Sequence, residues 1–109
     1  SPSQMIADKL SAISTEKVFR RIKDVVDLYY ISKVFPFRTD EILHTLESNG
    51  RTLDSFSGFL HRKDELKHSY EKFRFTGDVR KPSFEEVYYA VKVYIKDVLP
   101  REKHRETER

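Results

Sequence analysis

Apolar residues recur every three or four positions along most of the chain, which is the spacing of an amphipathic α-helix. Near the N-terminus, Ile6, Leu10 and Ile13 follow this spacing, and Pro2 stands where the first turn of a helix accepts proline. Only three glycines occur in the whole sequence, and no segment alternates clearly between apolar and polar residues as a strand would. The pattern therefore predicts a protein built from helices.

A second helix is expected from about Glu16 to Lys33. Ser14 or Thr15 would cap its N-terminus, and Pro36 would end it because proline disfavours helical backbone at the residue before it. At 100° per residue its apolar positions fall on one side. These positions are Val18, Phe19, Ile22, Val25, Val26 and Tyr29.

The remaining elements are four helices and a loop. They are a helix that Thr39 caps and Ser48–Gly50 ends, a short helix near Asp54–His61, a helix over about Lys63–Phe73, a loop over Thr76–Pro82, and a last helix. Ser83 and Glu86 form a capping-box pattern at the start of that last helix. The expected buried positions of these helices are Ile42, Leu43, Leu46, Phe56, Phe59, Leu60, Leu66, Tyr70, Phe73, Val87, Tyr88, Val91, Tyr94, Ile95 and Val98. We expect an all-α bundle of five to six helices over residues 1–100 and a charged flexible tail over 101–109.

Composition narrows the class of protein. The 109 residues suit one domain, and the absence of cysteine excludes a disulfide scaffold, a thiolate metal site and a cysteine nucleophile. The net charge of +3 is too small to predict non-specific nucleic-acid binding by itself. No apolar run would cross a bilayer and no signal peptide opens the chain, so a cytoplasmic location is expected. The chain begins without methionine and almost directly with a helical pattern, which favours a piece of a larger protein.

The second helix carries a row of charges opposite its apolar side. Arg20, Lys23, Asp24 and Asp27 are spaced i, i+3, i+4 and i+7, so Arg20 could pair with Asp24 and Lys23 with Asp27. One interpretation is a solvated, self-paired surface. The other is a site in which cations hold phosphate oxygens while carboxylates hold Mg²⁺ or accept a proton. The spacing alone does not choose between them.

Two motifs carry a resemblance to a known family. "IADKLSAIS" and "RRIKDVVDLYYIS" resemble the second half of AbiEii/AbiGii-type nucleotidyltransferases, which are toxins of type IV toxin–antitoxin systems and abortive-infection proteins. The family's third motif, a helix ending in "AxK" or "AEK", matches "ADK" and places its lysine at Lys9. The fourth, "R-x-[KR]-D-x-x-D-L", matches residues 21–28. The order and separation of the two motifs also agree.

The resemblance implies roles for five residues, and the polar row adds Arg20 as a lower-ranked candidate. Lys9 would contact nucleotide phosphate or assist the catalytic centre, and Asp24 would be the essential acidic residue, as a proton acceptor or a metal-side ligand. The nucleotide-binding candidates are Arg21 and Lys23 for phosphate, Asp27 to orient a neighbour, and Arg20, which lies outside the motif and ranks lower.

The resemblance covers only the C-terminal half of that family. The family's earlier motifs are a Gly-Ser or Gly-Thr turn and a "D-x-D" pair, whose carboxylates hold the catalytic metal. This sequence contains no "D-x-D" pair and no Gly-Ser or Gly-Thr turn after a strand. The intact protein would use Mg²⁺ and a nucleoside triphosphate to transfer a nucleotide to an RNA or protein acceptor. Its partners would be the missing N-terminal nucleotidyltransferase domain, a cognate antitoxin and an RNA such as tRNA. This chain alone is expected to be inactive, with no metal site and no cofactor.

Three other patterns each have two interpretations. His61, Glu65 and His68 are spaced for one helical face, but no fourth metal ligand accompanies them, so we favour partly exposed polar residues. Five tyrosines suit base stacking, yet their spacing favours packing in the core and at its edge, with hydroxyls that reach water. They are Tyr29, Tyr30, Tyr88, Tyr89 and Tyr94. A set of basic residues, diluted by Glu65 and Glu71, favours a solvated face over a contact with the RNA backbone. It comprises Arg62, Lys63, Lys67, Lys72, Arg74, Arg80 and Lys81.

The alternative function is a non-enzymatic helical interaction or regulatory module that binds a protein partner. In that interpretation the charges from Arg20 to Asp27 form only a polar surface or an interface. A helix-turn-helix DNA-binding protein is a weaker third option, because no short turn separates a basic recognition helix from the helix before it.

Overall fold

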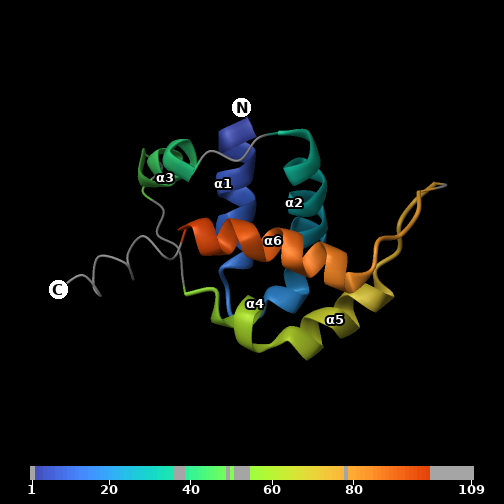
Figure 1. Ribbon diagram of the computed structural model, residues 1–109. Coiled ribbons are helices and arrows are strands. Elements are labelled where there is room, and N and C mark those ends of the chain that lie inside the picture. Colours follow the sequence, from blue (N-terminus) through green and yellow to red (C-terminus); the bar gives the residue numbers. More distant parts are fainter. Residues whose placement is uncertain (1, 36–38, 49, 51–54, 78, 99–109) are drawn as a thin grey trace.

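Helices α1 (Pro2–Ile13) and α2 (Ile22–Val34) stand side by side, and a short 3₁₀ helix, η1 (Val18–Arg21), connects them (Figure 1). The computed structural model describes residues 2–35, 39–48, 50, 55–77 and 79–98. The other helices are α3 (Thr39–Ser48), α4 (Ser57–His61), α5 (Lys63–Lys72) and α6 (Phe84–Val98). The described residues thus contain six α-helices and no strand, which confirms the predicted all-α fold.

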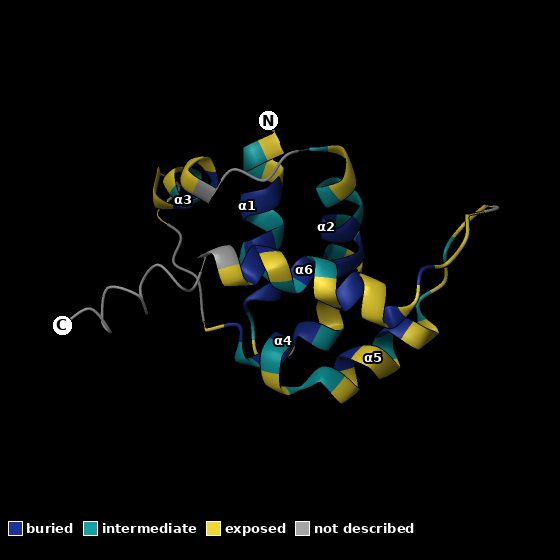
Figure 2. Ribbon diagram, viewed as in Figure 1, coloured by how far each residue is buried: buried dark blue, intermediate teal, exposed yellow. Residues whose placement is uncertain are grey.

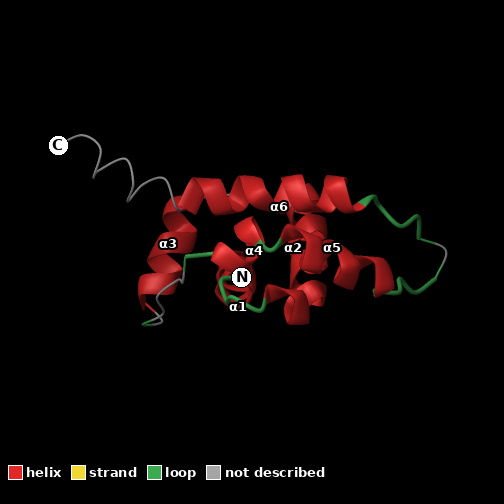
Figure 3. Ribbon diagram, turned by 90° about the horizontal axis from the view of Figure 1, so that it is seen from below, coloured by secondary structure: helices red, strands yellow, loops and turns green. Residues whose placement is uncertain are grey.

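Helix α6 crosses the α1–α2 pair at a steep angle, as Figures 1 and 3 both show. Helix α3 packs against α1 and α6, while α4 and α5 lie against η1 at the opposite end of α1. Between α5 and α6 the chain runs out and back as a long loop, whose described residues, 73–77 and 79–83, we call the arm. The arm projects from the helices at the end of the molecule farthest from α3 (Figure 1).

The core lies where α1, α2 and α6 face one another, and Figure 2 shows their buried sides turned inward. The predicted apolar positions of α1 and α6 that the structure describes are buried, and Leu28 of α2 joins them with no exposed surface. Phe56 and Phe59 bring the α4 segment into the same core. The side chain of Val98 and the tail 101–109 lie outside the described residues.

The predicted start of the second helix was wrong. Helix α2 begins at Ile22 rather than near Glu16, and neither Ser14 nor Thr15 caps it. Ser14 instead donates its hydroxyl to the Ser11 carbonyl and completes the end of α1. Ser69 of α5 donates to the Phe19 carbonyl over 2.7 Å, which holds η1 against α5. This tertiary contact accompanies a break in the helical backbone just before α2.

The other boundaries agree closely with the sequence pattern. Helix α3 ends at Ser48, and Gly50 follows with a φ of +67°, a conformation that favours glycine. Helix α4 begins at Ser57, directly after Phe56 in the left-handed region. Helix α5 spans Lys63–Lys72, one residue shorter than expected. The predicted start of α4 near Asp54 was too early, since Ser55 and Phe56 are not helical. Pro36 and the side chain of Thr39 lie outside the described residues, so the predicted stop and cap at these positions stay predictions.

The predicted cap of α6 is confirmed. The backbone N–H of Glu86 donates to Ser83 Oγ over 3.1 Å. The carboxylate of Glu86 accepts the hydroxyl of Tyr29 on α2 at 3.0 Å and pairs with Arg80 of the arm at 3.6 Å. The start of α6 is therefore bound both to α2 and to the arm.

Candidate functional site

A lysine of α1 lies between two aspartates of α2. Lys9 Nζ is 3.1 Å from Asp24 Oδ1 and 2.8 Å from Asp27 Oδ2. The two aspartates are three residues apart, so both project from one side of α2 toward α1. Residues separated by 15 and 18 positions in the sequence thus meet across the interface of the two central helices.

Two further cations complete this arrangement. Arg21 Nε lies 3.0 Å from Asp24 Oδ2, and Lys23 Nζ lies 3.1 Å from Asp27 Oδ2. The predicted pair of Lys23 with Asp27 is confirmed. We call Lys9, Arg21, Lys23, Asp24 and Asp27 the Lys9 cluster. Its three cations and two carboxylates leave a net charge of +1.

Arg20 is not part of the Lys9 cluster. Its expected ion pair with Asp24 was wrong, since Asp24 is bound by Lys9 and Arg21 instead. The spacing i, i+4 requires a continuous α-helix, whereas Arg20 lies in η1 and the backbone leaves helical geometry at Arg21. Arg20 is exposed, at the edge of the segment that carries Arg21.

The aspartates are less solvated than a free polar surface would be. Their side chains are 18% and 29% exposed for Asp24 and Asp27, compared with 74% for Lys23. The predicted row therefore does not point away from the protein, because its acidic members face α1 while its basic members reach toward solvent. Shielding of this kind strengthens the attraction between opposite charges.

The pKa values of the two best-connected groups reflect this contact. The pKa of Lys9 lies above its ordinary value, chiefly because its ammonium donates to Asp27, although partial burial acts in the opposite direction. Burial would raise the pKa of Asp27, but the hydrogen bonds from Lys9 and Lys23 outweigh it, so that pKa lies below its ordinary value. Both charged forms are therefore favoured in the folded protein.

A hollow of about 530 Å³ opens beside the Lys9 cluster. Its wall combines charged, small and apolar side chains: Met5, Asp8, Lys9, Ser11, Ala12, Arg21 and Asp24. The sequence did not predict Met5, Asp8, Ser11 or Ala12 as residues of the site. The helical spacing of Met5 and Ala12 from Lys9, four residues before it and three after it, is the signal that places both on the same face of α1.

The donor set of the Lys9 cluster suits phosphate better than a metal ion. Lys9, Arg21 and Lys23 offer the ammonium and guanidinium donors that bind phosphate oxygens. Both carboxylates already accept from cations, and no third acidic or histidine side chain joins them closely enough to form a metal-binding group within the described residues.

The predicted placement of His61, Glu65 and His68 on one helical face was wrong. Helix α4 ends at His61 and α5 begins at Lys63, with Arg62 between them outside either helix. His61 and His68 therefore lie on different helices. Glu65 forms an ion pair with Arg62 at the start of α5.

The tyrosines follow the core interpretation with one clear exception. Tyr29, Tyr88 and Tyr94 are buried and Tyr30 is half-buried, whereas Tyr89 on α6 is 51% exposed. Tyr89 follows Tyr88 by one position on α6, so its side chain points away from the apolar side that contains Tyr88.

Comparison of the chain with models of protein families, with curated proteins and with solved structures finds no match. Among the described residues, no helix combines the length and apolar character that crossing a bilayer requires.

Proposed function

We propose that this chain is the helical half of a nucleotidyltransferase toxin-like protein and that the Lys9 cluster completes its nucleotide site. The observation that carries the proposal is the meeting of Lys9 with Asp24 and Asp27 between α1 and α2. The lysine belongs to one motif of the resembling family and the aspartates to the next. Two motifs that act in one site must lie together in space, and these do.

The geometry supports different roles for the residues of the Lys9 cluster. Lys9 and Arg21 both border the hollow beside the cluster, so their charged groups can bind phosphate oxygens of a nucleotide held there. Asp24 also borders the hollow and would accept the proton of an attacking hydroxyl. Asp27 lies on the other side of Lys9 and would hold its ammonium in place.

The group that this proposal requires besides the nucleotide is Mg²⁺, which would neutralise phosphate charge during transfer. The family resemblance assigns that ion to a "D-x-D" pair outside this chain. The residues present here would bind and orient the phosphates and move the proton. In this proposal the chain needs its N-terminal partner domain for activity.

A second candidate is the non-enzymatic interaction module. Its specific support is that every cation of the Lys9 cluster already has a carboxylate partner, as expected of a purely structural clamp between α1 and α2. In that case substitutions in the cluster would lower stability and change no nucleotide-dependent property. The two proposals therefore differ in a measurable way.

The test uses the protein encoded together with its upstream segment, which should contain a Gly-Ser or Gly-Thr turn and a "D-x-D" pair. Lys9→Ala and Asp24→Ala should each lower nucleotide transfer by about 10²–10⁴-fold while the variants remain folded by circular dichroism. Arg20→Ala is the matched control, because it removes a neighbouring charge outside the cluster. Normal transfer by the Lys9 and Asp24 variants, or an upstream segment without those motifs, would contradict the proposal.

A further inference from the structure

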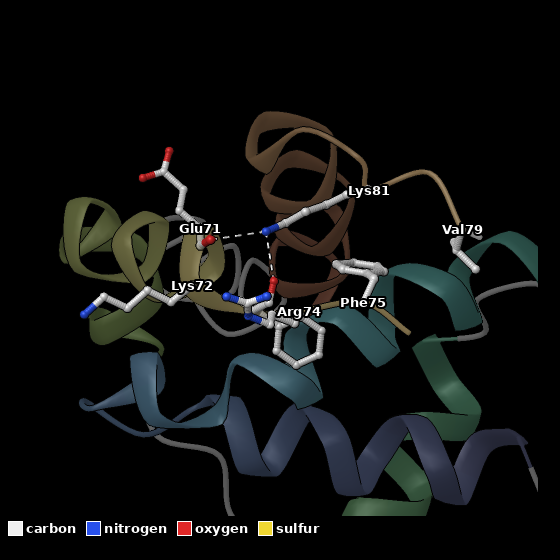
Figure 4. Close-up of a pocket in the computed structure, with 7 residues that line it drawn as sticks. Glu71, Lys72, Arg74, Phe75, Val79 and Lys81 are labelled. Atoms are coloured by element: carbon white, nitrogen blue, oxygen red, sulfur yellow. Dashed lines mark hydrogen bonds between the residues drawn. The ribbon is translucent and has the colours of Figure 1, made fainter. Parts of the chain in front are cut away.

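A second opening, of about 640 Å³, lies where the arm leaves the end of α5. Its lining is basic and aromatic, as Figure 4 shows: Glu71, Lys72, Phe73, Arg74, Phe75, Val79 and Lys81. None of these residues belongs to the Lys9 cluster. We call this opening the arm pocket.

Two cations of the arm pocket are available to a ligand. Lys72 and Arg74 are exposed, and no acidic side chain pairs with either of them within the described part of the chain. Among the described residues, Glu71 is the only acidic one that lines the pocket, and Figure 4 shows its carboxylate directed away from Arg74. Unpaired cations beside an open space attract anions.

Lys81 has a different role. Its ammonium donates to the backbone carbonyls of Tyr70, Glu71 and Phe73 at 3.1, 3.3 and 2.9 Å. These carbonyls lie at the C-terminal end of α5, where the helix carries partial negative charge. Lys81 thus fixes the returning side of the arm to α5 and keeps the pocket in shape, and its own charge is largely satisfied.

The aromatic wall of the arm pocket consists of rings that pack against one another. Phe75 meets Phe73, Tyr70 and Tyr30 edge-on, with ring centroids 5.4, 6.2 and 6.3 Å apart. Figure 4 shows the Phe75 ring between Arg74 and Val79, and Val79 is 55% exposed. The packed Phe75 ring, the exposed Val79 side chain and the two exposed cations together form a mixed apolar and cationic surface.

The arm pocket lies on the same side of α2 as part of the Lys9 cluster. Phe75 packs against Tyr30, which is three residues after Asp27 and seven after Lys23. Residues with these spacings share one face of a helix, and seven residues extend over about 10 Å. A ligand longer than one nucleotide could therefore extend from the arm pocket toward the Lys9 cluster.

We propose that the arm pocket binds single-stranded nucleic acid. Lys72 and Arg74 would hold two phosphates, and a base would pack against Phe75 and Val79, a combination that suits any base because every base has an apolar face. An acidic peptide would satisfy the cations but leave the apolar wall without a partner. This surface goes beyond the proposed nucleotide site and requires no residue of it.

The experiment measures binding of a fluorescein-labelled oligouridylate of about ten nucleotides to the 109-residue chain by anisotropy over a salt series. The double variant Lys72→Ala/Arg74→Ala should bind at least about tenfold more weakly. The slope of log affinity against log salt should become shallower by about 1.4, or 0.7 for each lost phosphate contact. Lys67→Ala/Lys96→Ala removes the same charge from exposed positions outside the pocket and should leave affinity within about twofold.

Three results would overturn this proposal. They are no binding of the oligonucleotide at low salt, equal weakening by the two double variants, and equally tight binding of polyglutamate. Both pairs of substitutions are on exposed side chains, and circular dichroism checks that each variant is folded. Binding of the oligonucleotide is measured on the 109-residue chain and nucleotide transfer on the longer protein, so a failed arm pocket and a failed nucleotide site give different results.

Discussion

Lys9 and Asp27 join the two central helices through a hydrogen-bonded ion pair of 2.8 Å, although 18 residues separate them in the sequence. Asp24 shares the same ammonium at 3.1 Å. Partial shielding from water makes this contact stronger than an ordinary surface pair. It therefore contributes to the packing of α1 on α2 whatever ligand the protein binds.

Replacing Lys9 should destabilise the isolated chain. Lys9→Met keeps the aliphatic stem but leaves two partly buried carboxylates without their shared partner, so the free energy of unfolding should fall by about 1–2 kcal/mol. Urea denaturation followed by circular dichroism measures it. Lys96→Met, at an exposed position on α6, is the control and should change stability by less than about 0.5 kcal/mol. Equal stability of the two variants would show that the cluster does not hold the helices together.

The contribution of Asp27 should depend on pH. Its pKa is lowered from 3.8 in the folded protein, so the stabilisation is present above 3.8 and disappears as the pH falls through the folded value. The stability advantage of the unmodified chain over Asp27→Asn should therefore narrow between about pH 5 and about pH 2. Urea titrations across this range measure the difference.

A double variant provides the control for the pH experiment. In a Lys9→Met background, Asp27 loses a hydrogen bond that lowers its pKa, so the same comparison with Asp27→Asn should vary less with pH. An unchanged pH dependence in that background would assign the effect to groups other than Lys9.

Gly58 should be hard to replace. A Cβ there would lie 2.1 Å from the carbonyl oxygen of Glu16, which is backbone and cannot rotate away. Gly58→Ala should therefore push α4 off the turn between α1 and η1 and lower the free energy of unfolding by about 1–3 kcal/mol. Thermal melting compares it with Ser57→Ala, the neighbouring helical position, which should melt close to the unmodified chain. A normal melting temperature for Gly58→Ala would contradict the close packing.

The cap of α6 can be tested by one substitution that lowers stability and a second that restores it. Ser83→Ala deletes the acceptor for the Glu86 N–H and should cost about 1 kcal/mol of stability. Ser83→Asn retains an oxygen acceptor and should recover most of that loss. Urea denaturation of the three proteins measures both steps. If asparagine is no better than alanine, the hydrogen bond is not the source of the effect.

Most of the fold was predictable because helical periodicity and capping residues are local signals. Ile6, Leu10 and Ile13 marked the buried side of α1, and Ser83 marked the start of α6, without any knowledge of the tertiary structure. The break before α2 was not predictable in this way. It coincides with Ser69 bonding the Phe19 carbonyl from 50 residues away, and no local pattern contains that contact.

The candidate site was likewise predictable only where local sequence patterns determine its contacts. The local pairing of Lys23 with Asp27 followed from spacing on one helix, and the association of Lys9 with Asp24 came from the family resemblance rather than from periodicity. The partner of Asp24 on its own segment was misassigned as Arg20, because that pairing assumed a continuous helix. Arg21 takes this place since the backbone changes course at that residue.

The carboxylate of Glu86 connects the two surfaces on which ligands are proposed to bind. It accepts from Tyr29, two residues after Asp27, and it pairs with Arg80 at the base of the arm. A ligand that breaks the ion pair between Arg80 and Glu86 would change the environment of the Glu86 carboxylate. That carboxylate also accepts the hydroxyl of Tyr29 on α2. Thermodynamic linkage makes such an influence mutual, so occupancy near the Lys9 cluster would change affinity at the arm by the same factor. A single carboxylate thus connects the arm to the middle of α2.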